Sequence, residues 1–280
     1  MSNSNKKIQI YVVSHSEEDI KNINANDIYV PLFVGRNGKD NLGFVSDDTG
    51  DNISEKNLYY CELTGLYWMW KQSKADIIGL CHYRRYFNND KGSLLQKEDI
   101  INYLTNNDII LPKKSALLKG TYGETFKNHY LLEILELTRD VIIKISPDYL
   151  DCFDKIMNQD EFYNNNMFIA PKDLADDYSN WIFPILEEIE NRVKIEDYPR
   201  VLGLVSEAIF NVWINKHELK VKECNLKYTD NKLKFTMLLI NQPILRKLYQ
   251  FLYNNFLSKP IGEKIVEKVD NWFWNRHKLK

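Results

Sequence analysis

The chain has 280 residues, enough for one large α/β domain or for one domain with an appendage. A hydrophobic share of 44% and a charged share of 27% are ordinary for a globular protein, and a net charge of −2 argues against general nucleic-acid binding. The four cysteines form no CxxC pair, the N-terminus has no apolar signal segment, and no apolar run reaches the ~18 residues of a membrane span. These features predict a cytoplasmic protein with reduced thiols.

Two extended runs and a long polar stretch open the chain. Residues 8–14 and 28–34 are rich in β-branched and aromatic residues and predict the first two strands. Residues 35–57 are polar and punctuated by glycine, which is typical of a long loop. Long ordered loops in compact domains are often functional.

A helix is expected next, over about 55–72, with Ser54 as its N-cap. Its apolar residues recur at helical spacing, so one face should be buried. Glu62 lies at the edge of that face. Because a carboxylate there needs a partner, we expect an arginine of the segment 82–86 to supply it.

The segment 76–87 carries more information than any other. Its apolar run 77–81 predicts a third, buried strand, which ends abruptly in His82, Tyr83, Arg84, Arg85 and Tyr86. In open α/β sheets, ligands bind outside the carboxyl ends of the strands. Paired arginines are suited to phosphate because they offer planar, bidentate donors that keep their charge. The alternative is an arginine-rich surface loop held by salt bridges.

The second half of the chain continues the alternation. Short strands are expected at 108–111 and 164–170, and a polar loop over 112–130 lies between them. Helical patterns cover 130–144, 148–158, 173–193 and 204–216. Strands that alternate with helices predict an α/β fold with a mostly parallel sheet.

The sign of the charge changes near residue 240, where we place the boundary between a domain over 1–240 and a tail over 241–280. The tail holds eight Lys or Arg residues and three acidic ones, mixed with aromatic residues at helical spacing. Such a segment suits the face of an anionic membrane, and it equally suits a helix pair docked on the domain.

Several motifs, in order along roughly 8–215, resemble a bacterial family known as domain of unknown function 4422, which occurs in capsule, exopolysaccharide and O-antigen gene clusters. The segment 79–87, with its His-Tyr-Arg-Arg-Tyr core, is specific. The weaker matches are 48–54, Asn57, 61–71, 146–149, 166–170, 181–186 and 206–213. One departure is Ser14-His15-Ser16, where the family usually has a Cys-His-Lys-like end, so the charge of that lysine is lost.

The resemblance implies a glycosyltransferase with a GT-A-like, Rossmann-type sheet flanked by helices, followed by a C-terminal helical tail. Galactofuranosyl transfer from a UDP donor is one activity linked to the family. A GT-A enzyme normally holds its donor diphosphate through a metal bound by an Asp-x-Asp motif at a strand end. Here His82-Tyr83-Arg84 stands where that motif is expected.

Two solutions for the diphosphate follow. In the first, which we favour, Arg84 and Arg85 neutralise it directly and stabilise the charge that develops on the leaving group. In the second, Mn²⁺ or Mg²⁺ is held by carboxylates of the loop 47–51, such as Asp48 and Asp51, with phosphate oxygens completing its shell. Asn52 of the same loop is grouped with these donor-binding residues. The alternative for the whole loop is a solvated turn with Asx hydrogen bonds.

An inverting transferase needs a general base on the acceptor hydroxyl, and its transition state resembles an oxocarbenium ion. The resemblance makes Glu207 the first candidate and His82 another, although His82 is also suited to bind a phosphate or the sugar. As structure alone, Glu207 is a glutamate near the start of a helix, favoured by the helix dipole. Asp76 is a third candidate. The alternative is that Asp76 has only a structural role, as the first residue of the strand.

Further residues are expected to contact the donor or the acceptor. Asn166, at the front of a strand, is suited to hydrogen-bond sugar hydroxyls, or simply to end a turn. Tyr122 and His129 suit a lid over the donor, although an isolated histidine is more often structural. Tyr83 and Glu62 complete the predicted set.

The sequence therefore predicts a glycosyltransferase that is cytoplasmic and peripheral at the inner face of the cell membrane if the tail binds there. It would transfer a hexosyl residue, galactofuranose by the resemblance, from a UDP-sugar to a glycan or lipid-linked acceptor. The alternative is a non-catalytic glycan-binding or scaffold protein of a polysaccharide assembly complex. A nucleotidyltransferase would need a glycine-rich phosphate loop after the first strand, and residues 11–22 contain no glycine.

Overall fold

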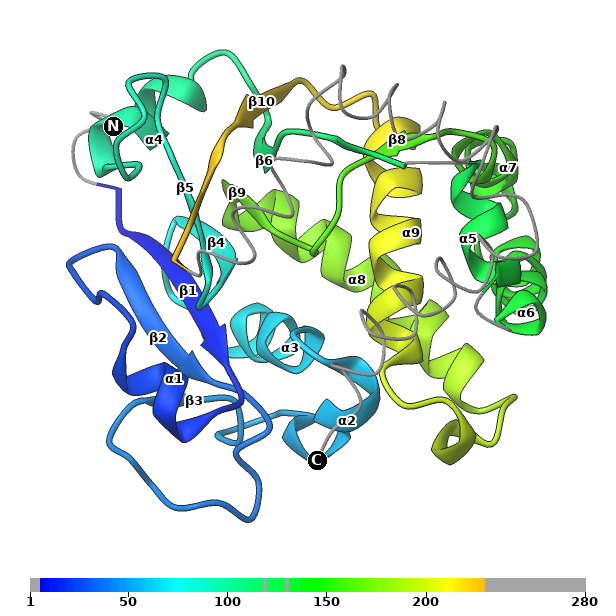
Figure 1. The fold of residues 1–280 in the computed structure, drawn as a ribbon, viewed down its shortest axis with the longest axis horizontal. Coiled ribbons are helices and arrows are strands. Elements are labelled where there is room, and N and C mark those ends of the chain that lie inside the picture. Colours follow the sequence, from blue (N-terminus) through cyan, green and yellow to red (C-terminus); the bar gives the residue numbers. More distant parts are fainter. Residues whose placement is uncertain (1–5, 118–119, 129–130, 230–280) are drawn as a thin grey trace, which may run out of the picture.

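A central sheet with helices on both faces forms the protein (Figure 1). The computed structural model describes residues 6–117, 120–128 and 131–229. The predicted boundary near 240, the tail 241–280 and His129 lie outside the described residues. Within those residues, no helix is both long and apolar enough to cross a membrane.

Within the described residues, the main sheet has nine strands, seven of them in the order β10-β6-β9-β4-β1-β2-β3. Parallel pairing joins β1 to β2, β1 to β4, β2 to β3 and β6 to β10, whereas β9 runs antiparallel to both of its neighbours. The prediction of an α/β fold with a mostly parallel sheet is therefore confirmed. The strands of this path are β1 Ile8–Ser14, β2 Tyr29–Phe33, β3 Val45–Ser46, β4 Ile77–His82, β6 Ile109–Pro112, β9 Phe168–Pro171 and β10 Val221–Cys224.

Two short strands, β5 Arg85–Phe87 and β11 Leu226–Tyr228, pair with each other, and β5 also pairs with the end of β4. Arg85 lies directly opposite His82 in that pairing. The chain therefore turns back immediately after β4, with Arg84 in the turn and Arg85 in β5. A further two-stranded sheet joins β7 Ser115–Ala116 to β8 Glu161–Phe162.

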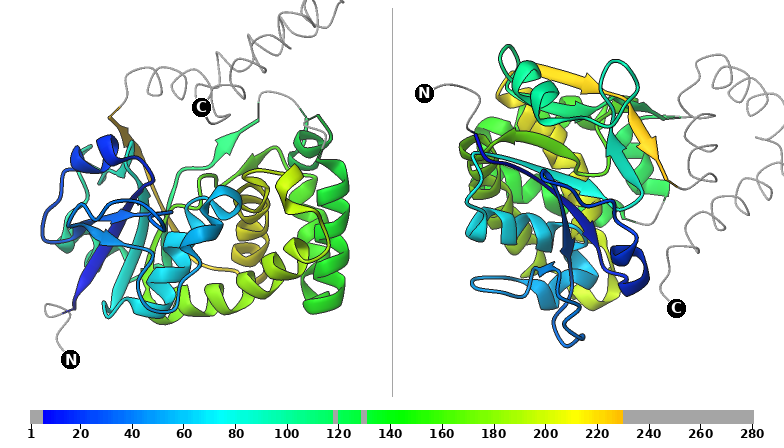
Figure 2. Two further views of the ribbon diagram at one scale, coloured as in Figure 1. Left: turned by 90° about the horizontal axis from the view of Figure 1, so that it is seen from below. Right: turned by 90° about the vertical axis from the view of Figure 1, so that its left-hand side faces the viewer.

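The apolar run 10–13 within β1 reflects burial on both faces of the sheet. Tyr11 and Val13 pack into the core beneath the larger helical layer, whereas Ile10 and Val12 pack into the core on the opposite face. Figure 2 shows the helical layer to one side of the sheet. Its helices are α2 Asn57–Tyr60, α3 Leu63–Gln72, α5 Tyr122–Asn128, α6 Leu132–Ile145, α7 Leu150–Met157, α8 Lys172–Glu190 and α9 Val201–Lys216, and the opposite face carries α1 Glu17–Lys21 and α4 Lys97–Tyr103.

Two sequence expectations are wrong in detail. The single helix expected over 55–72 is a 3-10 turn, Ser54–Lys56, followed by α2 and α3, which are separated at Cys61 by a left-handed φ of 52°. The polar loop expected over 112–130 contains β7 and α5. In both places non-local packing decides the backbone conformation, and local composition does not report it.

Candidate functional site

The carboxyl ends of β1 and β4 lie side by side, and their side chains form the candidate site. The two strands pair in parallel with Val13 opposite His82, and the backbone N–H of Tyr83 donates to the carbonyl of Val13 at 3.2 Å. From β1 the chain continues to β2 on one side, and it returns through α3 to β4 on the other. This is a topological switch point, where open α/β sheets bind ligands.

His82 is held by the backbone of Asn165. Its Nε2 lies 2.7 Å from the carbonyl oxygen of Asn165, and because a carbonyl only accepts, Nε2 carries the proton. Burial lowers the pKa of His82, and the nearby Glu62 opposes this shift. In this arrangement Nε2 donates a hydrogen bond, so it is not placed to accept a proton from an acceptor.

Glu207 has the most perturbed carboxyl group of the site. Burial, and then the negative charge of Glu62, raise the pKa of Glu207 to about 7. A hydrogen bond from the Asn165 backbone and the charges of Arg85 and Arg200 lower this pKa, but their effect is smaller. Glu207 lies in the second turn of α9, which begins at Val201, so the alternative of a first-turn glutamate favoured by the helix dipole is wrong. A carboxyl group poised near neutrality is suited to general acid–base chemistry.

Asn166 ties Glu62 to α9. Its Nδ2 lies 2.7 Å from Oε1 of Glu62 and 2.8 Å from Oγ of Ser206, while its Oδ1 is buried without a hydrogen-bond partner. The hydrogen-bond partner of Glu62 is thus an amide and not the expected arginine. Arg85 interacts with Glu62 only through the attraction of their charges. The strand expected to begin at 164 starts at Phe168, because Asn165 and Asn166 both adopt left-handed conformations, with φ of 69° and 50°.

The two arginines of the predicted pair point to different surroundings. The Arg84 side chain is 45% exposed, lies over the ring of Tyr83 and comes within 3.8 Å of the Asp19 carboxylate. Arg85 is directed inward, where burial lowers its pKa against the nearby charges of Glu207 and Glu62. Its Nε is buried and has no hydrogen-bond partner in the described part of the protein. The donor-binding role of the pair stays a prediction.

The loop residues proposed as metal ligands have structural partners. Asp48 pairs with the Arg36 guanidinium and accepts a hydrogen bond from Oγ of Ser46 at 2.7 Å. Asp51 is exposed and accepts from the hydroxyl of Tyr67 at 3.1 Å. Asn52 accepts from the backbone N–H of Ser54 at 3.1 Å, as an Asx turn does.

A divalent cation does not fit Asp48, because the charge of Asp48 is already neutralised by Arg36, and Asp51 is exposed beside the ammonium of Lys71. Across the described residues, no cluster of three His, Cys, Asp or Glu side chains has the arrangement of a metal site.

Tyr122 is part of the core. It begins α5, is only 6% exposed and packs against Phe126 and Phe162. Burial, and then the charge of Glu207, raise the pKa of Tyr122 well above its ordinary value. Its hydroxyl therefore lies within electrostatic range of the site, in a buried position that does not suit a lid.

Two residues that the sequence did not single out belong to the site. Arg200 immediately precedes α9, and its positive charge lowers the pKa of both His82 and Glu207. His15 follows β1, and its pKa is lowered first by burial and then by the cations Lys39 and Arg200. His15 lies in the segment that departs from the family pattern, and it was not predicted as a site residue. Arg200 has no local sequence signal, because its place depends on contact with Cys61, which is far away in the sequence.

The specific segment of the sequence, 79–87, thus lies at the switch point of the sheet. Residues 9–218 match the family described as Domain of unknown function (DUF4422). The chain belongs to this family. No curated protein matches the chain.

Among solved structures, the chain is similar to one described as the apo structure of WbbM, a bifunctional glycosyltransferase. The two share 31% sequence identity with a TM-score of 0.68, over 80% of this chain and 46% of that one. The α/β fold with its central sheet therefore matches a glycosyltransferase fold. The chain spans less than half the length of WbbM.

Proposed function

We propose that the protein is a nucleotide-sugar-dependent glycosyltransferase that acts with inversion, with Glu207 as its general base. The observation that carries the proposal is the state of Glu207, a half-buried residue at the switch point of a glycosyltransferase-like sheet, whose carboxyl pKa is raised to about 7. The position of the site matches the place where the fold class binds its ligands.

In the proposed reaction, Glu207 removes the proton from an acceptor hydroxyl as its oxygen attacks the anomeric carbon of the donor sugar. The bond between that carbon and the phosphate oxygen breaks, and its electron pair leaves with the nucleoside diphosphate. Arg84 and Arg85 stabilise the charge that develops on the leaving phosphate. No step passes through a metal, since the loop carboxylates do not fit one.

The finer assignment rests on the family resemblance. The donor is a UDP-sugar, with galactofuranose as the transferred residue, and the acceptor is a glycan or lipid-linked oligosaccharide of capsule or exopolysaccharide synthesis. Tyr83, Asp51, Asn52 and Asn166 stay proposed contacts of donor or acceptor. Asn166 would contribute through its free Oδ1, because its Nδ2 already has partners.

Replacement of Glu207 by Gln tests the proposal, because it keeps the shape of the side chain and removes its basicity. We expect kcat for release of UDP from the donor in the presence of acceptor to fall by roughly 10²-fold to 10⁴-fold, with little change in UDP affinity measured by calorimetry. A control is Glu188→Gln on α8, whose carboxylate pairs with Lys144 and Arg192.

Full activity in the Glu207→Gln variant would remove this residue from the reaction. Wild-type protein that gives no heat with UDP, and no turnover with any UDP-sugar, would instead favour the scaffold alternative.

A further inference from the structure

Resting on the proposed glycosyltransferase function, we propose that Arg200 is a third arginine of the donor site, which binds the diphosphate together with Arg84 and Arg85. The three guanidiniums come from two separate parts of the chain. Arg84 and Arg85 follow β4, and Arg200 precedes α9, the helix that carries Glu207. Arg200 would thus bind the leaving diphosphate at the start of the same helix that carries the base, Glu207.

The backbone of Arg200 is held in a conformation that arginine rarely adopts. Its φ is +67°, in the left-handed region, and its N–H donates to the carbonyl of Leu58 at 2.9 Å. Its guanidinium lies against the thiol of Cys61, which is itself left-handed with a φ of 52°. Strained residues persist where the surrounding structure imposes them, and they gather at functional sites.

The positive charge of Arg200 affects three titratable groups of the site that come from different elements. It lowers the pKa of His15 after β1, of His82 at the end of β4 and of Glu207 in α9. The Arg200 side chain is exposed, and within the described residues it forms no ion pair with a carboxylate.

The surroundings of His15 show that other cations converge there. The charges of Lys39 and Arg84 act on His15 beside that of Arg200, and Nζ of Lys39 donates to the carbonyl of His15 at 3.2 Å. Of the charges with the largest effect on the pKa of His15, those of Lys39, Arg200 and Arg84 are positive and that of Asp19 is negative. Positive charge therefore exceeds negative charge at the carboxyl end of β1, which favours an anionic ligand.

An independent observation points to the same ligand. The Nε of Arg85 is buried and has no hydrogen-bond acceptor in the described part of the chain. A buried donor without an acceptor is costly, and a ligand is one common explanation for it. A diphosphate that lies between the arginines would supply acceptor oxygens to Arg85 and negative charge to Arg200.

The sharpest test is Arg200→Gly, because glycine adopts a φ of +67° without strain. This variant should unfold at the temperature of the wild type or higher, so a loss of binding cannot be assigned to misfolding. We expect its dissociation constant for UDP, measured by calorimetry, to rise roughly 10-fold to 100-fold, as for the loss of a charge-assisted hydrogen bond. Arg200→Lys keeps the charge and loses the planar fork, so it should lie between the two.

Two controls make the result specific. Arg139→Ala removes an arginine that pairs with Asp154 between α6 and α7, and it should leave UDP affinity unchanged. Uridine, which has no phosphate, should bind the wild type and the Arg200→Gly variant equally. Each titration is run in EDTA and in manganese, and the loss is expected in both.

The outcomes separate this proposal from the proposed function. If the wild type binds UDP and the folded Arg200→Gly variant binds it equally well, Arg200 is not a diphosphate ligand, although the enzyme proposal stands. Equal losses for uridine and UDP would also overturn the inference. If the wild type binds no UDP at all, the proposed function fails with it.

Discussion

Glu62 and Glu207 lie close enough for the charge of one to affect the ionisation of the other. Such a pair divides its roles when the two carboxyl groups have different surroundings. Glu62 accepts a hydrogen bond from the amide of Asn166, whereas burial and then the charge of Glu62 raise the pKa of Glu207 to about 7. We infer that Glu62 is a positioning residue, whose charge adds to the larger effect of burial and raises the pH at which Glu207 becomes a base.

This inference predicts a pH dependence. Glu207 must lose its proton to act, and its pKa is raised, so kcat should rise with pH and level off above about 7. Glu62→Gln keeps an acceptor for Asn166 and removes the negative charge, so the rise should move to lower pH, by roughly one unit. The measurement is the pH profile of transfer.

The matched control for this profile is Glu190→Gln, whose carboxylate accepts from Lys56 and Tyr60. Its profile should coincide with that of the wild type. A Glu62→Gln profile that does not move would show that Glu62 has no influence on the base.

The site could be predicted in part at the level of residues. His82, Arg84 and Arg85 follow a strand whose apolar run is evident in the sequence, so their place at its carboxyl end was predicted correctly. Arg200 could not be found in this way, because an arginine with a left-handed backbone leaves no local signal. Its position depends on contact between the break at Cys61 and the start of α9, which are far apart in the sequence.

Among the elements, the turn at Asn165 and Asn166 connects the parts of the site. Asn165 contributes backbone atoms, which bond His82 of β4 and Glu207 of α9. Asn166 contributes its side chain, which bonds Glu62 and Ser206. Asparagine tolerates the left-handed conformation better than most residues, which explains its use twice in succession here.

These different roles predict different effects of the same substitution. Asn166→Gly keeps the left-handed backbone and removes the bonds to Glu62 and Ser206, so it should lower the free energy of unfolding by about 1–3 kcal/mol and reduce kcat. Asn165→Gly, the matched control, retains the backbone bonds to His82 and Glu207 and should change kcat little. Urea unfolding and transfer assays measure both effects, and equal kcat in the two variants would contradict the assigned roles.

Elements with strong periodicity were predictable and the turn between them was not. The run 8–14 was predicted with its observed bounds, and α8 and α9 lie within three residues of the expected ends. Residues 164–167 were expected to belong to a strand because the following residues are apolar. The positive φ values of Asn165 and Asn166 serve hydrogen bonds to three distant elements, so only the assembled fold explains them.

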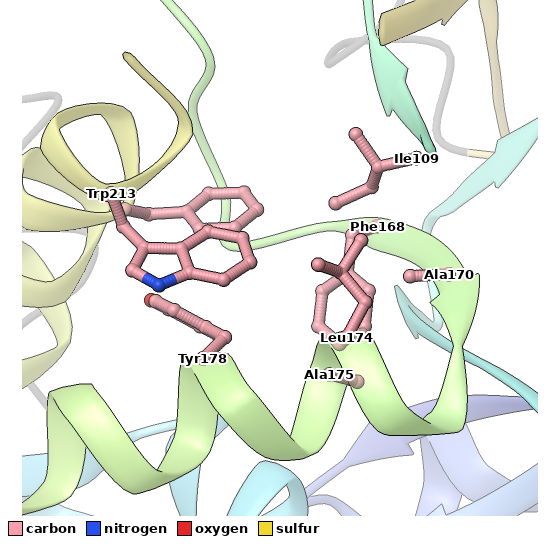
Figure 3. Close-up of a pocket in the computed structure, with 8 residues that line it drawn as sticks. Ile109, Phe168, Ala170, Leu174, Ala175, Tyr178 and Trp213 are labelled. Atoms are coloured by element: carbon pink, nitrogen blue, oxygen red, sulfur yellow. The ribbon is translucent and has the colours of Figure 1, made fainter. Parts of the chain in front are cut away.

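Over the whole molecule, the sheet and the helical layer meet at an aromatic junction. Phe168 of β9, Phe210 and Trp213 of α9, and Tyr178 of α8 surround a narrow apolar gap that has no room for a water molecule (Figure 3). The antiparallel strand β9 makes this junction, because it lies between β4 and β6 and leads directly into α8. The order of strands was not evident from the sequence, since neither β9 nor its partners carry a signal for pairing direction.

The hydroxyl of Tyr178 is the unfavourable feature of this junction. It is buried and has no hydrogen-bond partner in the described part of the protein. Tyr178→Phe removes that hydroxyl while it keeps the ring contacts with Phe210 and Trp213, so we expect the free energy of unfolding to rise by about 1 kcal/mol. The opposite sign is expected for Tyr60→Phe, because the Tyr60 hydroxyl donates to Glu190 at 2.8 Å, and its loss should cost about 1 kcal/mol. Chemical denaturation of both variants beside the wild type measures the two shifts. A Tyr178→Phe protein less stable than the wild type would mean that the hydroxyl does have a partner, and that the junction holds a polar group deep in the core.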